Sequence, residues 1–387
     1  MYATSLNIPS RLEGNLDSII RSSRTHRDEL AQYVHRPVFK HVLYDPPSYW
    51  YDSLPSYNLF SLRTLVDSLN IENDPYVQTL RGKLARARPS SAEWLRLDQT
   101  LSDTIIKADT FTHRGLREFV SAAESLCMDI GEWAADWFIT EVIKHARRAD
   151  PKSSIMFTWQ ASERQYLLQN LGKIPLVPVA DNPDEIRHML TPKVEALIAC
   201  LIAEEEEARE AGETYSGLVF VERRATVIAL AEVLSRLPET AQLFRVGCLL
   251  GSSASIHRRA FLDITREIVK DTHTKTLEDF RGGGKNLIVS TSVGEEGIDI
   301  QACGSVIRFD PPQNVVAWAQ SRGRARRKRS TFVMMLEQGK QHELIIQKWF
   351  DIERRMTELY TDPDRAAPTM YEDDEDDKRE FRVESTG

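Results

Sequence analysis

Apolar residues recur at two different spacings along the chain, and the change between them divides it into two regions. From residue 57 to 172 they recur every three or four positions, which predicts amphipathic helices. After Pro192 and one further amphipathic helix at 193–210, short apolar runs alternate with helical stretches. These runs are 217–221, 244–250, 286–292, 305–309 and 331–336. The pattern predicts an all-α domain followed by an α/β domain with a doubly wound parallel sheet.

The flanking segments predict smaller elements. Residues 1–45 are typical of two short helices and a strand, and residues 340–361 of one more helix. Residues 363–387 are rich in proline and then in acidic side chains, which is typical of an exposed linker.

A parallel sheet also predicts where a ligand binds. In such sheets ligands bind beyond the carboxyl ends of the strands. The loops that begin at Glu222, Gly251, Thr291 and Asp310 all leave strand ends of this kind. We therefore expect these loops to converge on one edge.

The net charge hides a local basic stretch. The chain has 41% hydrophobic and 28% charged residues and a formal net charge of −8. Much of the acid lies in Glu204–Glu207 and near the C-terminus, whereas residues 308–329 hold seven basic residues against one acidic residue. A local basic patch is the feature that matters for nucleic-acid binding, so the acidic total does not exclude this class of partner.

Other function classes are disfavoured. No apolar run approaches the roughly 18 residues of a membrane span, and the N-terminus lacks a secretory pattern. The four cysteines are scattered and form no CxxC pair, which favours reduced thiols over a disulfide framework or a metal site. We expect no membrane partner and a cytoplasmic protein, with the nucleus left open as an alternative.

Residues 287–329 contain the most informative chemistry. Two apolar strands are followed by the loop GEEGID and by the stretch QSRGRARRKR. Carboxylates suit a ribose, and planar guanidinium groups suit the charge that spreads over a γ-phosphate during phosphoryl transfer. The sequence contains no phosphate-cradling GxxxxGK[ST] loop and no DExH motif. The residues therefore predict half of a nucleotide site, whose other half must come from elsewhere.

The same residues carry a family resemblance. NLIVSTSVGEEGIDIQAC, VIRFDPP and AWAQSRGRARRKRSTFVMML together resemble the second RecA-like domain of superfamily 2 helicases. The EEGIDI and QSRGRAR forms are similar to the branch that contains Dicer and innate-immune RNA sensors. Two flanking stretches, NLDSIIRSSRTHRDELAQYVHRPVFKHVLY and REFRVESTG, are similar to the helicase region of fungal Dicer-like proteins.

The resemblance implies five parts of the chain. Residues 1–45 would be the tail of a first helicase domain, and 46–175 the helical insertion domain. Residues 176–339 would be the C-terminal RecA-like domain, 340–362 a linking helix, and 363–387 an acidic linker with the start of a dimerisation domain. Ribonuclease III motifs are absent from the sequence.

The resemblance also implies roles for individual residues. Arg324 matches the first arginine finger, and either Arg326 or Arg327 matches the second, since the crowding of arginines leaves the register open. The residues that would contact or shape the nucleotide site are Gln320, Gly297, Asp299, Glu296 and Gly323. The residues that would contact the nucleic-acid backbone are Ser290, Thr291, Gly251 and Ser252. For Gln320, an amide on a helix face is an equally weighted alternative.

These roles imply a function with two alternatives. As part of a Dicer-like protein, the chain would contribute to binding and hydrolysis of ATP and to double-stranded RNA binding in RNA silencing and antiviral defence. Magnesium would be supplied through the first helicase domain, and the implied partners are that domain and a ribonuclease III portion. Hydrolysis by this chain alone is not expected, because the P-loop half is absent. The alternatives are a non-catalytic RNA- or protein-binding remnant and a fragment of a DNA-repair helicase of superfamily 2.

Overall fold

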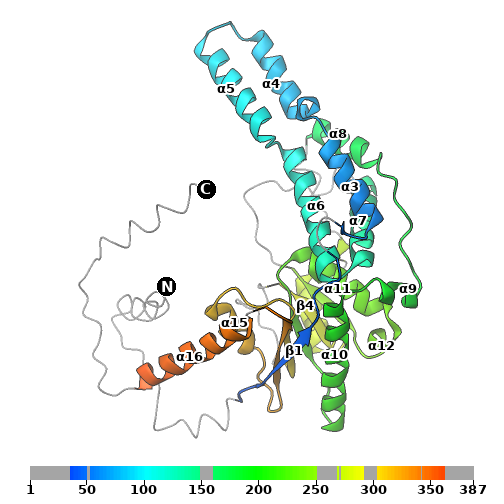
Figure 1. The fold of residues 1–387 in the computed structure, drawn as a ribbon, viewed down its shortest axis with the longest axis vertical. Helices are drawn as coiled ribbons and strands as arrows, with labels where there is room; N and C mark the ends of the chain where they lie inside the picture. Colours follow the sequence, from blue (N-terminus) through cyan, green and yellow to red (C-terminus); the bar gives the residue numbers. More distant parts are fainter. Residues whose placement is uncertain are drawn as a thin grey trace, which may run out of the picture. The chain divides into compact units, whose positions relative to one another are not determined.

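The structure, a computed structural model, describes residues 35–49, 53–148, 160–250, 268–269, 272–291, 303–340 and 342–361. These form two compact units, one made of residues 35–340 and a second to which helix α16 (His342–Thr361) belongs. Figure 1 shows the elements of both units. In the described residues no helix is both long enough and apolar enough to cross a membrane.

The first unit contains a six-stranded parallel sheet with the strand order β1-β6-β5-β2-β4-β3. The strands are β1 (Val38–Tyr44), β2 (Gly217–Phe220), β3 (Val246–Leu249), β4 (Leu287–Ser290), β5 (Ser305–Arg308) and β6 (Thr331–Glu337). Every residue of β2, β4 and β5 is buried, as expected for central strands covered on both faces. The predicted α/β fold with a RecA-like parallel sheet is confirmed.

Strand β1 adds an element to this sheet from the start of the chain. It pairs in parallel with β6, with Val38 opposite Thr331 and Tyr44 opposite Glu337. These residues fall in the segment 1–45 that was expected to be the tail of a first helicase domain. In the structure, β1 is an edge strand of the same sheet as β2 to β6.

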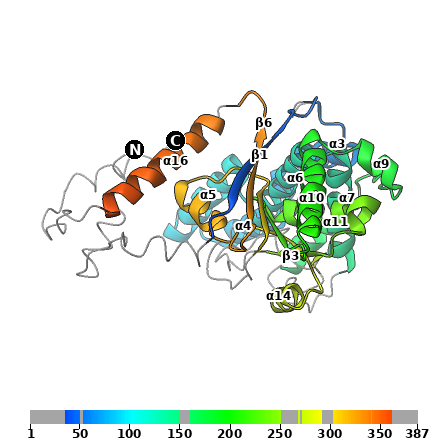
Figure 2. The ribbon, with the colours of Figure 1, turned by 90° about the horizontal axis from the view of Figure 1, so that it is seen from below.

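Helices cover both faces of the sheet. On one face lie α10 (Pro192–Glu210) and α11 (Arg224–Arg236), and Figure 2 shows them together with the helical region. On the other face Trp318 of α15 (Val315–Arg322) packs its ring on Phe39 and Phe332, at centroid distances of 5.5 and 5.1 Å. The short helices α12 (Pro238–Ala241) and α14 (His273–Arg281) connect the remaining strands.

The predicted all-α region is present between β1 and α10. Its helices are α3 (Tyr57–Ser68), the 3₁₀ turn η2 (Ile71–Asn73), α4 (Pro75–Arg86), α5 (Ala92–Lys107), α6 (Phe111–Asp129), α7 (Glu132–Arg148), α8 (Ala161–Leu171) and α9 (Pro183–His188). Asp74 and Thr110 cap α4 and α6 by accepting backbone N–H groups, which satisfies donors that a helix start leaves open. Helices α4 and α5 pack on each other around a small core of their own, formed by Val77, Leu80 and Leu101.

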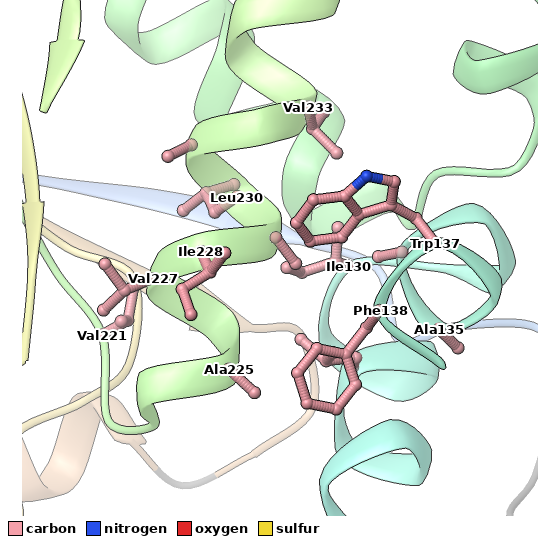
Figure 3. Packing of buried hydrophobic residues seen from close by; sticks show 14 of the residues in the cluster. Ile130, Ala135, Trp137, Phe138, Val221, Ala225, Val227, Ile228, Leu230 and Val233 are labelled. Atoms are coloured by element: carbon pink, nitrogen blue, oxygen red, sulfur yellow. The ribbon is translucent and has the colours of Figure 1, made fainter. Parts of the chain in front are cut away.

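One continuous apolar core joins the helical region to the sheet. Figure 3 shows Trp137 and Phe138 of α7 beside Ala225 and Ile228 of α11. All four side chains are buried. Because burial of apolar surface is the main favourable term in folding, the helical region and the sheet stabilise each other through this contact.

Candidate nucleotide and nucleic-acid site

The carboxyl edge of the sheet brings two of the predicted loops together. The Glu222 backbone N–H donates a 2.7 Å hydrogen bond to Asp310 Oδ2, and Gln313 Nε2 donates to Glu222 Oε1 at 2.6 Å. Thr291 reaches the same edge, where its N–H donates to the Leu249 carbonyl at 3.3 Å. The predicted convergence is therefore confirmed for the loops at Glu222 and Asp310, and Thr291 lies at the same edge. The loop at Gly251 lies outside the described residues.

A buried lysine occupies part of this edge. Lys193 Nζ lies 2.7 Å from Asp310 Oδ1 and 3.8 Å from Asp129 Oδ1, and it stacks 3.9 Å from the centroid of the Phe309 ring. Burial lowers the pKa of Lys193, but Asp310 and Asp129 raise it by more, so its pKa lies above the ordinary value. Lys193 is therefore a permanent cation that neutralises these two carboxylates.

The sequence contained little sign of this cluster. Asp129 ends α6, Lys193 follows the proline that begins α10, and Asp310 follows β5, so the three are far apart along the chain. A lysine in the first turn of a helix is unfavourable beside the helix dipole, and that position was the one available signal. In the described residues no group of three or more His, Cys, Asp or Glu side chains could hold a metal ion.

The candidate RNA-contacting residues at the end of β4 are enclosed. Ser290 is fully buried, and its hydroxyl donates a 2.9 Å hydrogen bond to the Thr291 carbonyl. Thr291 is 5% exposed and is the last described residue before the loop 292–302. Ser290 is therefore closed to a ligand, and Thr291 keeps only a small exposed fraction at the end of β4. Gly251 and Ser252 lie outside the described residues.

The arginine stretch lies at the opposite edge, beside the amino ends of β5 and β6. Helix α15 ends at Arg322, and the Gly323 N–H donates to the Ala319 carbonyl at 2.9 Å. A Cβ at Gly323 would lie 3.2 Å from that carbonyl oxygen, which explains why glycine suits the turn. Ser290 and Thr291 therefore lie at one edge of the sheet and the arginine stretch at the other.

Backbone hydrogen bonds hold the candidate finger to the segment that follows the GEEGID loop. The Arg324 carbonyl accepts a 3.1 Å hydrogen bond from the Cys303 N–H, and Cys303 pairs with Ala325 in a parallel bridge. Burial raises the pKa of the Cys303 thiol to about 12, and the nearby Arg327 and Arg324 guanidinium groups act in the opposite direction. The arginine stretch is thus hydrogen-bonded to the segment that follows the GEEGID loop.

The side chains of the arginine stretch differ in their surroundings. Arg324 is half-buried, whereas Arg326 is exposed and its Nε donates a 2.6 Å hydrogen bond to the Gly323 carbonyl. Arg327 is half-buried, and its Nη1 donates a 2.7 Å hydrogen bond to the Thr214 carbonyl. Gln320 is half-buried on α15. Glu296, Gly297 and Asp299 lie outside the described residues.

Comparison with known proteins defines the class first. Residues 192–329 match the helicase conserved C-terminal domain family. That range contains β2 to β5, α10, α11 and α15 with the arginine stretch. The chain therefore contains a helicase C-terminal domain, as the sequence motifs predicted.

Relatives that align with nearly the whole chain then indicate the branch of helicases to which it is similar. The chain is 35% identical over 363 residues to Dicer-like protein 2 of Aspergillus fumigatus, and this match covers 93% of the chain. It is 35% identical over 390 residues to Dicer-like protein 2 of Aspergillus terreus and 32% identical over 388 residues to that of Cryphonectria parasitica. The chain belongs with the helicase region of the fungal Dicer-like proteins, and it spans about a quarter of the length of these relatives (24%, 26% and 24%).

A solved structure, the Hef helicase domain of Pyrococcus furiosus, aligns with 82% of this chain and 59% of that one, at 19% identity and a TM-score of 0.37. A likeness of this strength carries no weight for the fold, which the strand order and the family match define.

Proposed function

We propose that this chain supplies the second half of an ATP site and contacts double-stranded RNA within a Dicer-like protein that acts in RNA silencing and antiviral defence. The observation that carries the proposal is the hydrogen bond between Cys303 and Arg324. It joins the first candidate finger to the segment that directly follows the GEEGID loop in the chain. Similarity to Dicer-like proteins over nearly the whole chain favours RNA over the DNA substrates of repair helicases.

The donor set suits a nucleotide held between two domains. Arg324 and Arg326 carry guanidinium groups, which match the oxygens of a phosphate, and Asp299 carries a carboxylate suited to a ribose hydroxyl. Magnesium would be held by a separate domain with a P-loop and an acidic motif. The bound metal would neutralise charge between the phosphates, and this chain would add positive charge from the side of the γ-phosphate.

The first test measures ATPase activity stimulated by double-stranded RNA. The full chain is assayed alone and together with a separately supplied first helicase domain of a Dicer-like protein. We expect activity from the pair and not from this chain alone. We expect Arg324→Ala to reduce kcat of the pair by about 10³-fold, because an arginine finger contributes on that order.

Lys328→Ala is the matched control. Lys328 is an exposed cation four residues from Arg324, and its removal changes the local charge by the same amount. We expect this variant to retain the activity of the unsubstituted pair. Activity of this chain alone would refute the half-site proposal, and full activity of Arg324→Ala in the pair would refute the finger assignment.

Binding of duplex RNA is tested separately at low salt, because phosphate contacts weaken steeply as salt rises. We expect binding that does not depend on sequence, since A-form RNA is recognised mostly by shape and backbone. A chain that binds duplex RNA without supporting ATPase activity in the pair would be the non-catalytic remnant. A chain that binds no RNA would retain only a role in protein binding.

A further inference from the structure

The guanidinium group of Arg327 is hydrogen-bonded to a segment far from the arginine stretch in sequence, whereas that of Arg326 is hydrogen-bonded within the stretch, to the Gly323 carbonyl. Arg327 Nη1 donates a 2.7 Å hydrogen bond to the Thr214 carbonyl, in the connection between α10 and β2. Its Cδ lies over Gly304, 3.7 Å from the place where a Cβ on that glycine would be. Arg327 therefore spans from the arginine stretch across the start of β5 to the start of β2.

The segments that Arg327 joins are the ones that support Arg324. The Gly304 N–H donates to the Ser216 carbonyl at 2.9 Å, and the Gly304 carbonyl accepts from the Thr331 N–H at 2.9 Å. Cys303, the residue before Gly304, donates to the Arg324 carbonyl. Three chain segments thus meet at Gly304, and the Arg327 side chain adds a fourth connection, from the arginine stretch directly to Thr214.

The surroundings of Arg327 do not suit a phosphate. An open pocket of about 390 Å³ lies beside it, and the lining includes the carboxylates of Glu204, Glu207, Glu210 and Glu213. Arg327 and Arg329 are the arginines in that lining, and Arg326 does not belong to it. A nucleotide γ-phosphate would meet repulsion from the carboxylates, because like charges at short range raise the free energy.

We propose that Arg327 is a positioning residue, which holds the Arg324–Arg326 loop against the Thr214 carbonyl, and that Arg326 rather than Arg327 is the second finger. This inference rests on the proposed ATP role of Arg324. A rigid loop presents its guanidinium groups in one place. Displacement of such a group by about 1 Å costs on the order of 100-fold in rate.

The test compares substitutions at three arginines in the assembled pair of helicase domains. Arg327→Ala should lower kcat by about 10- to 100-fold and leave KM for ATP unchanged, because it disorders a group that acts in the transition state. Arg327→Lys should recover most of kcat, since an ammonium group also donates to a carbonyl. Arg326→Lys should be as impaired as Arg326→Ala, because a lysine cannot form the planar fork that suits a phosphate.

Arg329→Ala is the matched control for charge. Arg329 is exposed, lies in the same stretch and lines the same pocket. We expect kcat within about twofold of the unsubstituted pair, because the Thr214 contact remains. An equal loss of kcat in Arg329→Ala would refute positioning in favour of a charge effect. Arg327→Lys as inactive as Arg327→Ala, with Arg326→Lys active, would make Arg327 the finger.

Amide hydrogen exchange of the unassembled chain provides a readout that does not need ATPase activity. Arg327→Ala should speed exchange at Cys303, whose N–H donates to the Arg324 carbonyl, and at Gly304, which lies beside the Arg327 side chain, while exchange in β2 and β4 stays slow. Unchanged exchange at Cys303 and Gly304 would refute the positioning role. An inactive unsubstituted pair whose chain shows the expected change would refute the proposed function and leave the positioning contact established.

Discussion

Lys193 and Asp310 form an ion pair that is almost closed to solvent, with 2.7 Å between Nζ and Oδ1 and exposed fractions of 8% and 14%. Lys193 is the second residue of α10, and Asp310 follows β5. Asp129, at the end of α6, is the second carboxylate beside the same Nζ. The helical region and the sheet therefore meet at one buried cation as well as at the apolar contact between α7 and α11.

Removal of that cation should be costly. We expect Lys193→Met to lower the free energy of unfolding by about 3–5 kcal/mol, because Asp310 would lose its 2.7 Å cationic partner and Asp129 would retain only the more exposed Arg223. The measurement is urea unfolding of the full chain. A methionine keeps the apolar stem against Phe309, so the variant isolates the charge.

Lys340→Met provides the comparison. Lys340 Nζ lies 2.7 Å from Glu337 Oε2, the same distance as in the buried pair, but Lys340 is 56% exposed. Exposed pairs contribute about 0–1 kcal/mol, so this variant should unfold close to the unsubstituted chain. Equal losses for the two lysines would show that burial does not distinguish the pairs.

The turn between α6 and α7 makes a second prediction. Gly131 has a φ of 133°, and a Cβ there would lie 2.0 Å from the Met189 carbonyl oxygen. A side chain cannot be accommodated without moving backbone, so Gly131→Ala should cost at least about 3 kcal/mol of unfolding free energy. Thermal or urea unfolding of the full chain measures this loss.

Gly212→Ala separates the two causes of that loss. Gly212 also has a positive φ, of 69°, but a Cβ added there would meet no heavy atom within 4 Å. Strain in the left-handed region alone should cost about 1–2 kcal/mol. If Gly131→Ala cost no more than Gly212→Ala, the close approach of Met189 would be irrelevant to stability.

The sequence predicted the sheet well because its signal is local. A run of consecutive apolar residues, such as 217–221 or 305–309, suits a buried strand of a parallel sheet whichever strand it pairs with. All five predicted strands of the α/β domain are present. The position of β1 was harder to predict. Its pairing with β6 joins residues almost 300 positions apart in sequence (Val38 with Thr331). The pattern of apolar and polar residues in an edge strand is the same whether the strand belongs to a first helicase domain or to the C-terminal one.

The sequence predicted the chemistry of the candidate site, but it predicted less well where the residues of the site lie in the fold. The chemistry of Arg324 and Arg326 follows from residue type, but the placement of the arginines and Thr291 at opposite edges depends on where α15 turns back. The different environment of Arg327 depends on the Thr214 carbonyl, which is a backbone atom and leaves no mark in the sequence. Lys193 was missed for the related reason that its partners are distant in sequence.

The reactivity of the buried thiols gives a further prediction, and Cys303 reports on the edge of the sheet beside the arginine stretch. Burial raises the pKa of Cys127, Cys200 and Cys303 to about 12 in each case. Since the thiolate is the reactive form, these thiols should react with an alkylating reagent at neutral pH far more slowly in the folded chain than in urea. Mass spectrometry of the alkylated peptides reads each site. Rapid labelling of Cys303 in the folded chain would show that the contact between the arginine stretch and β5 opens readily.

The pH dependence of stability should carry a contribution from His113. Burial lowers the pKa of His113 below its ordinary value of 6.5, although Asp74 acts in the opposite direction, and its Nε2 lies 3.3 Å from the Tyr166 hydroxyl. The unfolded chain then binds the proton more tightly than the folded chain. Its contribution to stability is present above pH 6.5 and is lost as pH falls through the lower folded pKa.

The direction of this change in stability with pH can be measured against a variant whose side chain at position 113 does not titrate. His113→Asn keeps a polar side chain on α6, and the difference in unfolding free energy between the unsubstituted chain and this variant is followed by urea unfolding from about pH 8 to about pH 5. We expect the difference to shift against the unsubstituted chain as pH falls, since folding must then exclude a proton that the unfolded imidazole binds. A shift in the opposite direction for His113 would mean that Asp74 outweighs burial and holds the imidazole protonated in the folded chain.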